Sequence, residues 1–371
     1  MAKHQKHSNL VRRQNDHFAS NEISILGTNC GVISELVQKL SEHLSNYKLA
    51  YFDASHAQNV DKNKIATYTF HHEGNLQITT SGNVNKFEQR LQFAHYDFVF
   101  INGNHYQGAK QILILDEEKE ASVLKRLDQL DRIEFVIKLK KESSFFSFLE
   151  EKYPHINTLK CYTIDEVAKI ANHLDDLIQE KVPSVKGLVL IGGKSTRMGA
   201  DKSTLDYHGV PQRKFVQEII ENHTIETYFS VQDFSENESE ISDVFLNLGP
   251  FGGICSAFQK DPNAAWLAVA IDLPFINEEV IQLLLEKRNP SKVATAIKGK
   301  GNAFVEPLIT IYEPKAYPIL LQYLAQGYSC PRKMLINSDV EIVEIDASLI
   351  LNVNTPEAFE AAKKEINSKH G

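Results

Sequence analysis

Apolar runs of strand length alternate with helical patterns from residue 22 to the end of the chain. Apolar residues spaced three and four positions apart predict helices at residues 34–44, 118–127, 164–179 and 277–285. Short, mainly apolar runs predict strands at residues 22–26, 49–52, 97–101, 134–137, 187–191, 228–231 and 266–271. Strands that alternate with helices are typical of α/β layers built on mostly parallel sheets.

A polar stretch with a proline at residues 180–186 interrupts this alternation, and the chain length of 371 residues suits two domains. We therefore predict a first domain at residues 21–182, a linker at 183–186 and a second domain at 187–371. The first 20 residues carry four Lys or Arg and a single Asp, without the apolar segment of a secretory signal. They predict a basic flexible tail.

Composition narrows the class of protein. The hydrophobic fraction of 42% suits a globular chain, and the net charge of −8 lacks the basic excess of a nucleic-acid-binding protein. No apolar stretch is long enough for a membrane-spanning helix. The four cysteines form no C-x-x-C pair, which favours reduced thiols and a cytoplasmic location over a disulfide framework.

Candidate chemistry begins in the loop LVLIGGKSTRMGADK, residues 188–202. Gly192 and Gly193 allow backbone N–H groups to approach an anion closely, and Arg197 and Lys202 can bind phosphate oxygens. Together they predict a cradle for a triphosphate. The order of residues differs from a Walker loop, in which Lys follows Gly directly. The alternative is a glycine-rich turn between a strand and a helix, with cations on the surface.

This loop resembles the signature G-G-x-S-x-R-M-G-x-D-K of molybdenum cofactor guanylyltransferases, which belong to the nucleotidyltransferase superfamily. The likeness extends over residues 186–371, about half of the chain. Four further segments resemble the family's motifs in order: GPFGGI at 249–254, AIDLP at 270–274, EPL at 306–308 and NVNTPE at 352–357. The resemblance implies a three-layer, Rossmann-like nucleotidyltransferase fold for this half.

The resemblance also implies an activity: transfer of GMP from Mg²⁺-GTP to the terminal phosphate of molybdopterin-bound molybdenum, with release of pyrophosphate. GTP and molybdenum-molybdopterin would be the substrates, a molybdoenzyme or cofactor-insertion protein could be a partner, and an oligomer is compatible with the sequence. A phosphate monoester is already an anion at neutral pH, because its second pKa is about 6, so the reaction needs no general base. The alternatives are a cytidylyltransferase or sugar-phosphate nucleotidyltransferase, and a non-catalytic cofactor carrier or adaptor.

Asp272 follows an apolar strand, so its carboxylate is expected at the carboxyl edge of the sheet, where it can bind Mg²⁺. Its alternative role, capping the helix at 277–285, is less favoured because Asn277 already supplies a cap. The resemblance implies that Asn354 binds the same ion, directly or through water. Asn354 can equally cap the helix that begins at Pro356.

The resemblance implies further site residues. The expected catalytic residues are Arg197, Lys202 and Asp272. The expected nucleotide-binding residues are Leu190, Ile191, Gly192, Gly193, Lys202, Gln232, Asp243 and Asp272. The expected substrate pocket consists of Gly249, Pro250, Gly252, Gly253, Glu306, Pro307, Asn352 and Asn354. Gln232 stands next to the position where the family has Asn and carries its amide one methylene further out, which leaves the choice of GTP over CTP open.

The first domain contains the frame of a phosphate-binding P-loop at residues 27–34, but Val32 and Ile33 replace its Gly and Lys. Residues 96–103 resemble a strand of the GTP-binding adaptor that partners these guanylyltransferases, with Asn102 at the position of that family's Glu. The resemblance implies a P-loop-NTPase-like fold. Without the lysine we expect no nucleotide binding, and pterin binding, dimerisation and partner docking remain as alternative roles.

Overall fold

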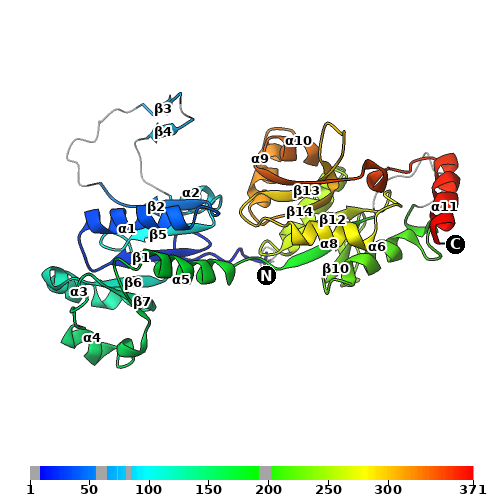
Figure 1. Ribbon diagram of the computed structural model, residues 1–371. Helices are drawn as coiled ribbons and strands as arrows, with labels where there is room; N and C mark the ends of the chain where they lie inside the picture. The colour runs from blue at the N-terminus through cyan, green and yellow to red at the C-terminus, as the bar shows by residue number, and fades with distance from the viewer. Residues whose placement is uncertain (1–8, 56–64, 73, 81–84, 192–201, 371) are drawn as a thin grey trace, which may run out of the picture. The chain divides into compact units, whose positions relative to one another are not determined.

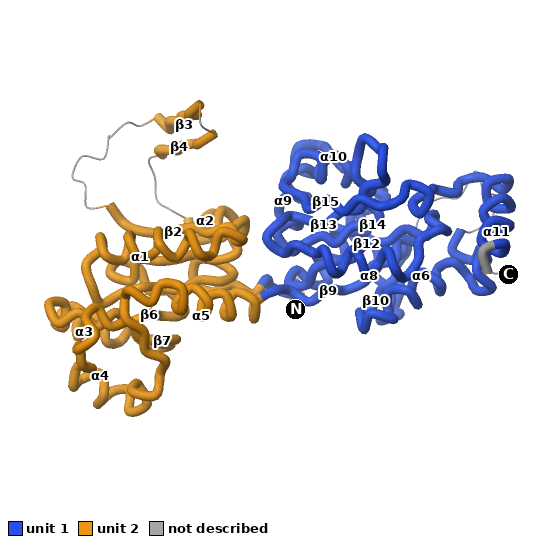
Figure 2. Tube along the Cα trace, viewed as in Figure 1, with its two compact units in different colours: residues 1–13, 182–371 blue, residues 14–181 orange. Residues whose placement is uncertain are grey.

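The computed structural model describes residues 9–55, 65–72, 74–80, 85–191 and 202–370. The chain forms two compact units, which are coloured separately in Figure 2. One consists of residues 14–181, here called the N-terminal unit. The other consists of residues 182–371 with the described residues 9–13, and is called the C-terminal unit.

The N-terminal unit is built on a fully parallel sheet with the strand order β2-β5-β1-β6-β7-β8, and a separate antiparallel hairpin, β3-β4, is inserted after β2 (Figure 1). Its strands are β1 (Glu22–Leu26), β2 (Leu49–Phe52), β3 (Thr67–Phe70), β4 (Leu76–Thr79), β5 (Phe98–Asn102), β6 (Gln111–Leu115), β7 (Ile133–Lys138) and β8 (Cys161–Thr163). Its helices are α1 (Cys30–His43), α2 (Lys86–Phe93), α3 (Glu120–Lys125), α4 (Ser147–Lys152) and α5 (Val167–Gln179).

Alternate residues of the central strands enter opposite layers of this unit. Phe98 and Phe100 of β5 pack in the cluster that α1 and α5 cover, whereas Val99 and Ile101 face the other side, where Phe93 of α2 packs. Every residue of β1, β5 and β6 is buried, as expected for a parallel sheet with both faces covered.

Residues 16–19 pack onto the start of β1. The carboxylate of the fully buried Glu22 accepts hydrogen bonds from the backbone N–H groups of His17, Phe18 and Ala19 at 2.7–3.1 Å. This part of the predicted flexible tail is therefore part of the unit's core, because a buried carboxylate needs such donors. Residues 1–8 lie outside the described residues.

The C-terminal unit has a mixed sheet with the order β11-β10-β9-β12-β14-β13-β15, in which β14 runs antiparallel to both neighbours. Its strands are β9 (Val185–Leu190), β10 (Thr227–Val231), β11 (Glu240–Ser242), β12 (Ala265–Ala270), β13 (Ala294–Gly299), β14 (Glu306–Tyr312) and β15 (Val340–Ile345). Its α-helices are α6 (Gln212–Glu221), α7 (Pro250–Lys260), α8 (Glu278–Glu286), α9 (Ala316–Ala325), α10 (Pro331–Ile336) and α11 (Pro356–His370), and a 3₁₀ turn, η4, covers Lys202–Thr204.

This sheet is also the middle of three layers. Leu188 and Trp266 pack with α7, α9 and α10, whereas Val189 and Leu267 pack with α6 and α8 on the other face. The predicted fold class, two three-layer α/β units, is confirmed. β9 begins at Val185, so the last two residues of the predicted linker belong to the sheet. No helix in the described part of the chain is long and apolar enough to cross a membrane.

Candidate active site

The carboxyl edge of the C-terminal sheet gathers polar residues from several elements. β9, β10, β11 and β12 are parallel, so their carboxyl ends meet at one edge, where ligands of α/β folds bind. β14 is antiparallel and therefore begins at this edge with Glu306. Asp243 and Asp272 follow β11 and β12, and Lys202 lies in η4.

Lys202 connects two motifs that are distant in sequence. Its ammonium group donates a hydrogen bond to Oδ1 of Asn354 at 2.6 Å and lies 3.9 Å from Oδ2 of Asp272. The backbone carbonyl of Asp272 accepts a hydrogen bond from Val353 N–H at 2.9 Å. The NVNTPE segment is thus fixed against the end of β12, with a lysine, a carboxylate and an amide side by side.

Neighbouring residues supply the helix caps that were the alternative roles of Asp272 and Asn354. Asn277 caps α8, because its Oδ1 accepts a hydrogen bond from Val280 N–H at 3.1 Å. The Thr355 hydroxyl accepts one from Ala358 N–H at 3.2 Å in the first turn of α11. Asp272 and Asn354 are therefore available for the site.

Burial and neighbouring charges perturb the acidic groups at this edge. Burial raises the pKa of Asp272, and the Lys202 cation opposes that rise. Burial also raises the pKa of Glu306, against the opposing effect of Arg332, while the charge of Asp272 raises it further. Burial and the charge of Asp272 together raise the pKa of Tyr207 to about 12. Such shifts are common where carboxylates are held for a ligand.

Asp243 is built into the turn before α7. Its Oδ1 accepts hydrogen bonds from Phe245 N–H at 2.9 Å and from the Ser256 hydroxyl at 3.0 Å. A Cβ at Gly252 would lie 2.5 Å from the Phe245 carbonyl oxygen and 2.8 Å from Asp243 Oδ2. Gly249 precedes the helix with a φ of +57°, a conformation that favours glycine. Glycines of this motif therefore allow the turn to approach the carboxylate closely.

The other predicted site residues differ in exposure. Leu190, Gly252, Gly253 and Pro307 are buried, Ile191 and Pro250 are partly buried, and Gln232, Gly249 and Asn352 are exposed. The Pro307 carbonyl accepts a hydrogen bond from the buried Tyr312 hydroxyl at 2.8 Å, so it supports β14. Gly192, Gly193 and Arg197 lie outside the described residues.

Two residues of this edge were not predicted from the sequence. Arg332, in α10, has a guanidinium nitrogen 3.3 Å from Oε2 of Glu306. Tyr207 is buried against the ring of Phe359 and close enough to Asp272 for that charge to affect its pKa. For Arg332, the sequence offered one signal, the basic pair Arg332-Lys333 directly after a proline. Nothing in the sequence around Tyr207 indicates that it lies at this edge.

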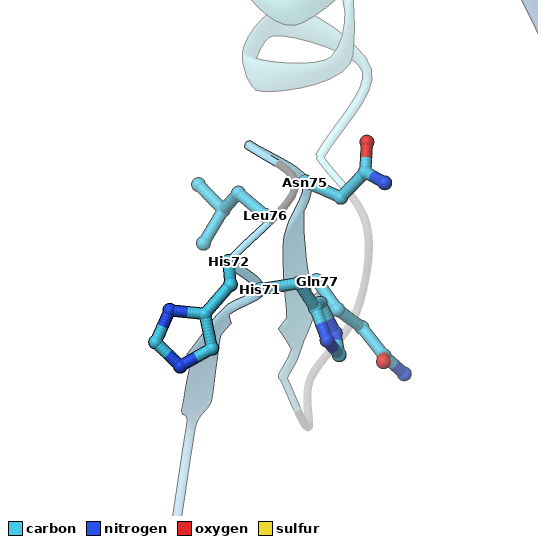
Figure 3. A pocket seen from close by; sticks show the side chains of 5 residues that line it. All are labelled: His71, His72, Asn75, Leu76 and Gln77. Atoms are coloured by element: carbon cyan, nitrogen blue, oxygen red, sulfur yellow. The ribbon is translucent and has the colours of Figure 1, made fainter.

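A hollow lies in the N-terminal unit, at the β3-β4 hairpin. It is lined by five exposed residues, and its two imidazoles lie apart from each other (Figure 3). Its lining residues are His71, His72, Asn75, Leu76 and Gln77. In the P-loop frame, Ile33 belongs to α1 and is fully buried in the core. The position of the phosphate-binding lysine therefore holds a packing residue.

Comparison with known proteins identifies the family of the C-terminal unit. Residues 187–341 match the family model described as the MobA-like NTP transferase domain. The probable molybdenum cofactor guanylyltransferase of Pyrococcus furiosus is 30% identical over 150 residues, which cover 38% of this chain and 75% of that protein. The chain belongs to the molybdenum cofactor guanylyltransferase family. This membership confirms the resemblance expected from the sequence motifs.

A second relative of this chain is the molybdenum cofactor biosynthesis bifunctional protein of a Synechocystis strain. It is 31% identical over 180 residues, which cover 47% of the chain and 52% of that protein, so the chain spans about half of its length. The solved structure of Bacillus subtilis MobB aligns with 41% of this chain, and the alignment covers 96% of the MobB chain. The two are 16% identical, with a TM-score of 0.31.

Proposed function

We propose that the C-terminal unit transfers GMP from GTP to the terminal phosphate of molybdopterin that carries molybdenum, releasing pyrophosphate. The observation that supports this most directly is the grouping of Lys202, Asp272 and Asn354 at the carboxyl edge of the sheet. A cation beside a partly buried carboxylate suits a substrate that brings phosphates and a metal ion together.

Mg²⁺ is the cofactor that this family implies, and the site fits it. Oδ1 of Asp272 is buried and has no hydrogen-bond partner among the described residues. Such an atom has lost its hydration and needs a cation or donor. Asp272 would hold the ion through this oxygen, and substrate phosphates would complete its ligands, since Mg²⁺ often binds through one or two carboxylates plus phosphates. Bound Mg²⁺ would neutralise charge on the triphosphate.

Lys202 would bind phosphate oxygens of the nucleotide. Its ammonium group has three donors, and among the described residues only Asn354 accepts a short hydrogen bond from it; the other donors would bind a phosphate. Asn354 would orient the ammonium group, and Arg197 of the predicted loop would bind a further phosphate oxygen. The attacking phosphate is already an anion, so positioning and charge neutralisation suffice for the reaction.

Glu306 and Arg332 would form the acceptor side of the site. The Arg332 side chain is 46% exposed, which leaves part of its guanidinium available to bind the terminal phosphate of the pterin. Glu306 would hold the guanidinium in position from the buried side. Asp243 and Gln232 would contact the base or ribose, with Asp243 fixed by the turn before α7.

A titration of GTP, CTP, ATP and UTP in the presence of Mg²⁺, followed by a transfer assay, tests this function. We expect one GTP per chain in the wild type and weaker, less metal-dependent binding in Asp272→Asn. Preference for CTP would replace the proposal by cytidylyl transfer. Absence of binding to any nucleotide would favour a carrier without catalytic activity.

A further inference from the structure

A second group of reactive side chains lies in the N-terminal unit, at the carboxyl ends of three neighbouring strands. Cys30 follows β1 as the first residue of α1, Asp53 follows β2, and His105 follows β5. We call these three residues the thiol cluster. They occupy the edge at which parallel sheets bind their ligands, and Cys30 stands inside the altered P-loop frame.

The side chains of Cys30 and Asp53 both approach Nε2 of His105. Sγ of Cys30 lies 3.4 Å from Nε2 of His105, and Oδ1 of Asp53 lies 3.7 Å from the same nitrogen. The Asn104 amide nitrogen is 3.7 Å from the sulfur. No set of three His, Cys, Asp or Glu residues in the described part of the chain could hold a metal ion. The arrangement therefore favours proton transfer between thiol and imidazole over metal binding.

A buried amide lies beside the cluster and supports it. Asn102 is fully buried, and its side chain influences the pKa of both Asp53 and Tyr51. Its Oδ1 accepts a hydrogen bond from the Asn104 N–H at 3.0 Å, so Asn102 holds the start of the loop that carries His105.

The surroundings of Cys30 suit a reactive thiol more than a packing residue. Its side chain is partly exposed, whereas Cys255 is fully buried. Cys30 also begins a helix of 14 residues, whose N-terminal N–H groups favour a negative charge on the sulfur. The loop lacks the lysine of a phosphate site, so chemistry at this edge is expected to involve the sulfur.

We propose that Cys30 is a nucleophilic thiol that His105 activates for exchange with small disulfides. His105 Nε2 takes the thiol proton, and the sulfur attacks one sulfur of the disulfide. A new S–S bond to Cys30 forms while the disulfide's own S–S bond breaks, and the leaving thiolate receives the proton from His105. One disulfide is consumed and one is formed, so no further oxidant is needed. Asp53 stabilises the imidazolium during the exchange.

The exchange ends in a mixed disulfide between Cys30 and the small molecule. All four cysteines are free thiols, and no other cysteine is among the contacts described for Cys30, so nothing next to it would resolve the product. The N-terminal unit therefore carries a site of reversible thiol modification, distinct from the nucleotide chemistry of the C-terminal unit.

The full-length chain contains the controls for a direct test. The four cysteines are labelled with limiting oxidised glutathione, or with iodoacetamide, and the rate at each is followed by peptide mass spectrometry. Cys161 and Cys330 are more exposed than Cys30, so exposure alone predicts that they react first. The proposal predicts instead that Cys30 reacts about tenfold faster than either, as expected for an activated thiol.

His105→Gln separates activation from accessibility. We expect it to slow Cys30 by about tenfold and to leave Cys161 and Cys330 unchanged, since it removes the base and keeps a side chain of similar size. If Cys161 is labelled faster in His105→Gln than in the wild type, that variant is unfolded, and His105→Asn is tested in its place. Equal rates at Cys30 and Cys161 in the wild type would overturn the proposal. Reactivity of Cys30 that appears only after a chelator is added would overturn it in favour of a metal site.

Discussion

The ammonium group of Lys202 lies 2.6 Å from Oδ1 of Asn354, although 152 positions separate the two residues in the sequence. This bond joins the loop that follows the first strand of the C-terminal unit to the segment before its last helix. Asp272, at the end of β12, lies between them in the sequence and 3.9 Å from the lysine nitrogen in space. The site therefore depends on tertiary structure that brings three distant motifs to one edge.

Replacing Lys202 by Ala should reduce guanylyl transfer by on the order of 10²–10³ in kcat, the usual cost of losing one donor to transition-state charge. Pyrophosphate release under saturating Mg²⁺-GTP measures this. Lys292→Ala is a matched control, because its ammonium group pairs with Asp339 at 2.6 Å just before β13 and β15 begin, at the opposite edge of the same sheet. Turnover of Lys202→Ala equal to that of the control would remove Lys202 from the proposed machinery.

Asp272→Asn should abolish activity and also stabilise the metal-free chain. Burial raises the pKa of Asp272, so the folded state binds this proton more tightly than the unfolded state does. The ionised carboxylate therefore opposes folding at neutral pH, and stability is gained as the pH falls through the raised pKa. Asn removes that opposition. Thermal unfolding at neutral pH, with and without Mg²⁺, measures both effects.

The two outcomes for Asp272→Asn distinguish the metal role from a structural one. The wild type should gain Tm on addition of Mg²⁺ and GTP, because ligands that bind the folded state stabilise it. The variant should begin with a higher Tm and gain less. A variant with lower Tm than the wild type in the absence of metal would show that the carboxylate supports the fold.

Much of this architecture could be predicted from the sequence, because strand burial leaves a local pattern. The bounds of β1 and β2 agree with the predicted ranges residue for residue. β6 was missed, since a short apolar run such as QILIL carries no periodicity. The antiparallel direction of β14 was also missed, because strand direction depends on the connections and not on the strand's own residues. That direction brings Glu306 to the site.

The motifs of the candidate site could be predicted from the sequence, but the contacts between them could not. Asp272 could be expected at a sheet edge because an apolar strand precedes it. The bond between Lys202 and Asn354 depends on how α11 packs. Thr355 caps that helix, so the structure does not use Asn354 as the cap, and its role toward a metal ion stays a prediction. Arg332 lies on a short helix whose position follows from packing against α9 and β14.

Arg332→Ala should raise the KM for the pterin acceptor by about tenfold and change kcat little, if the guanidinium binds the acceptor's phosphate. The loss of this cation also leaves the partly buried Glu306 without its opposing charge, so the pKa of Glu306 should rise further. Steady-state kinetics with the acceptor varied at saturating GTP measures the effect. Arg132→Ala is the control, since that exposed arginine pairs with Glu134 at 2.8 Å in the other unit.

Gly252→Ala should destabilise the C-terminal unit by about 1–3 kcal/mol, the usual cost of forcing an extra methyl group into a packed site. The new Cβ would lie 2.5 Å from the Phe245 carbonyl oxygen, which is backbone and cannot rotate away. Gly31→Ala is the matched control near the start of another helix, where the nearest atom is Asn29 Oδ1 at 3.4 Å. Denaturant unfolding should show the loss for Gly252→Ala alone.

The wild-type chain should bind one GTP, at the C-terminal unit, and the altered P-loop should add none. Ile33 lies on the buried face of α1. Ile33→Lys would therefore place a charge in the core and cost several kcal/mol of stability without restoring a phosphate site. Calorimetric titration of GTP gives the stoichiometry for the wild type and for Lys202→Ala. Binding that persists at one equivalent after Lys202→Ala combined with Asp272→Asn would locate the nucleotide in the N-terminal unit, against this expectation.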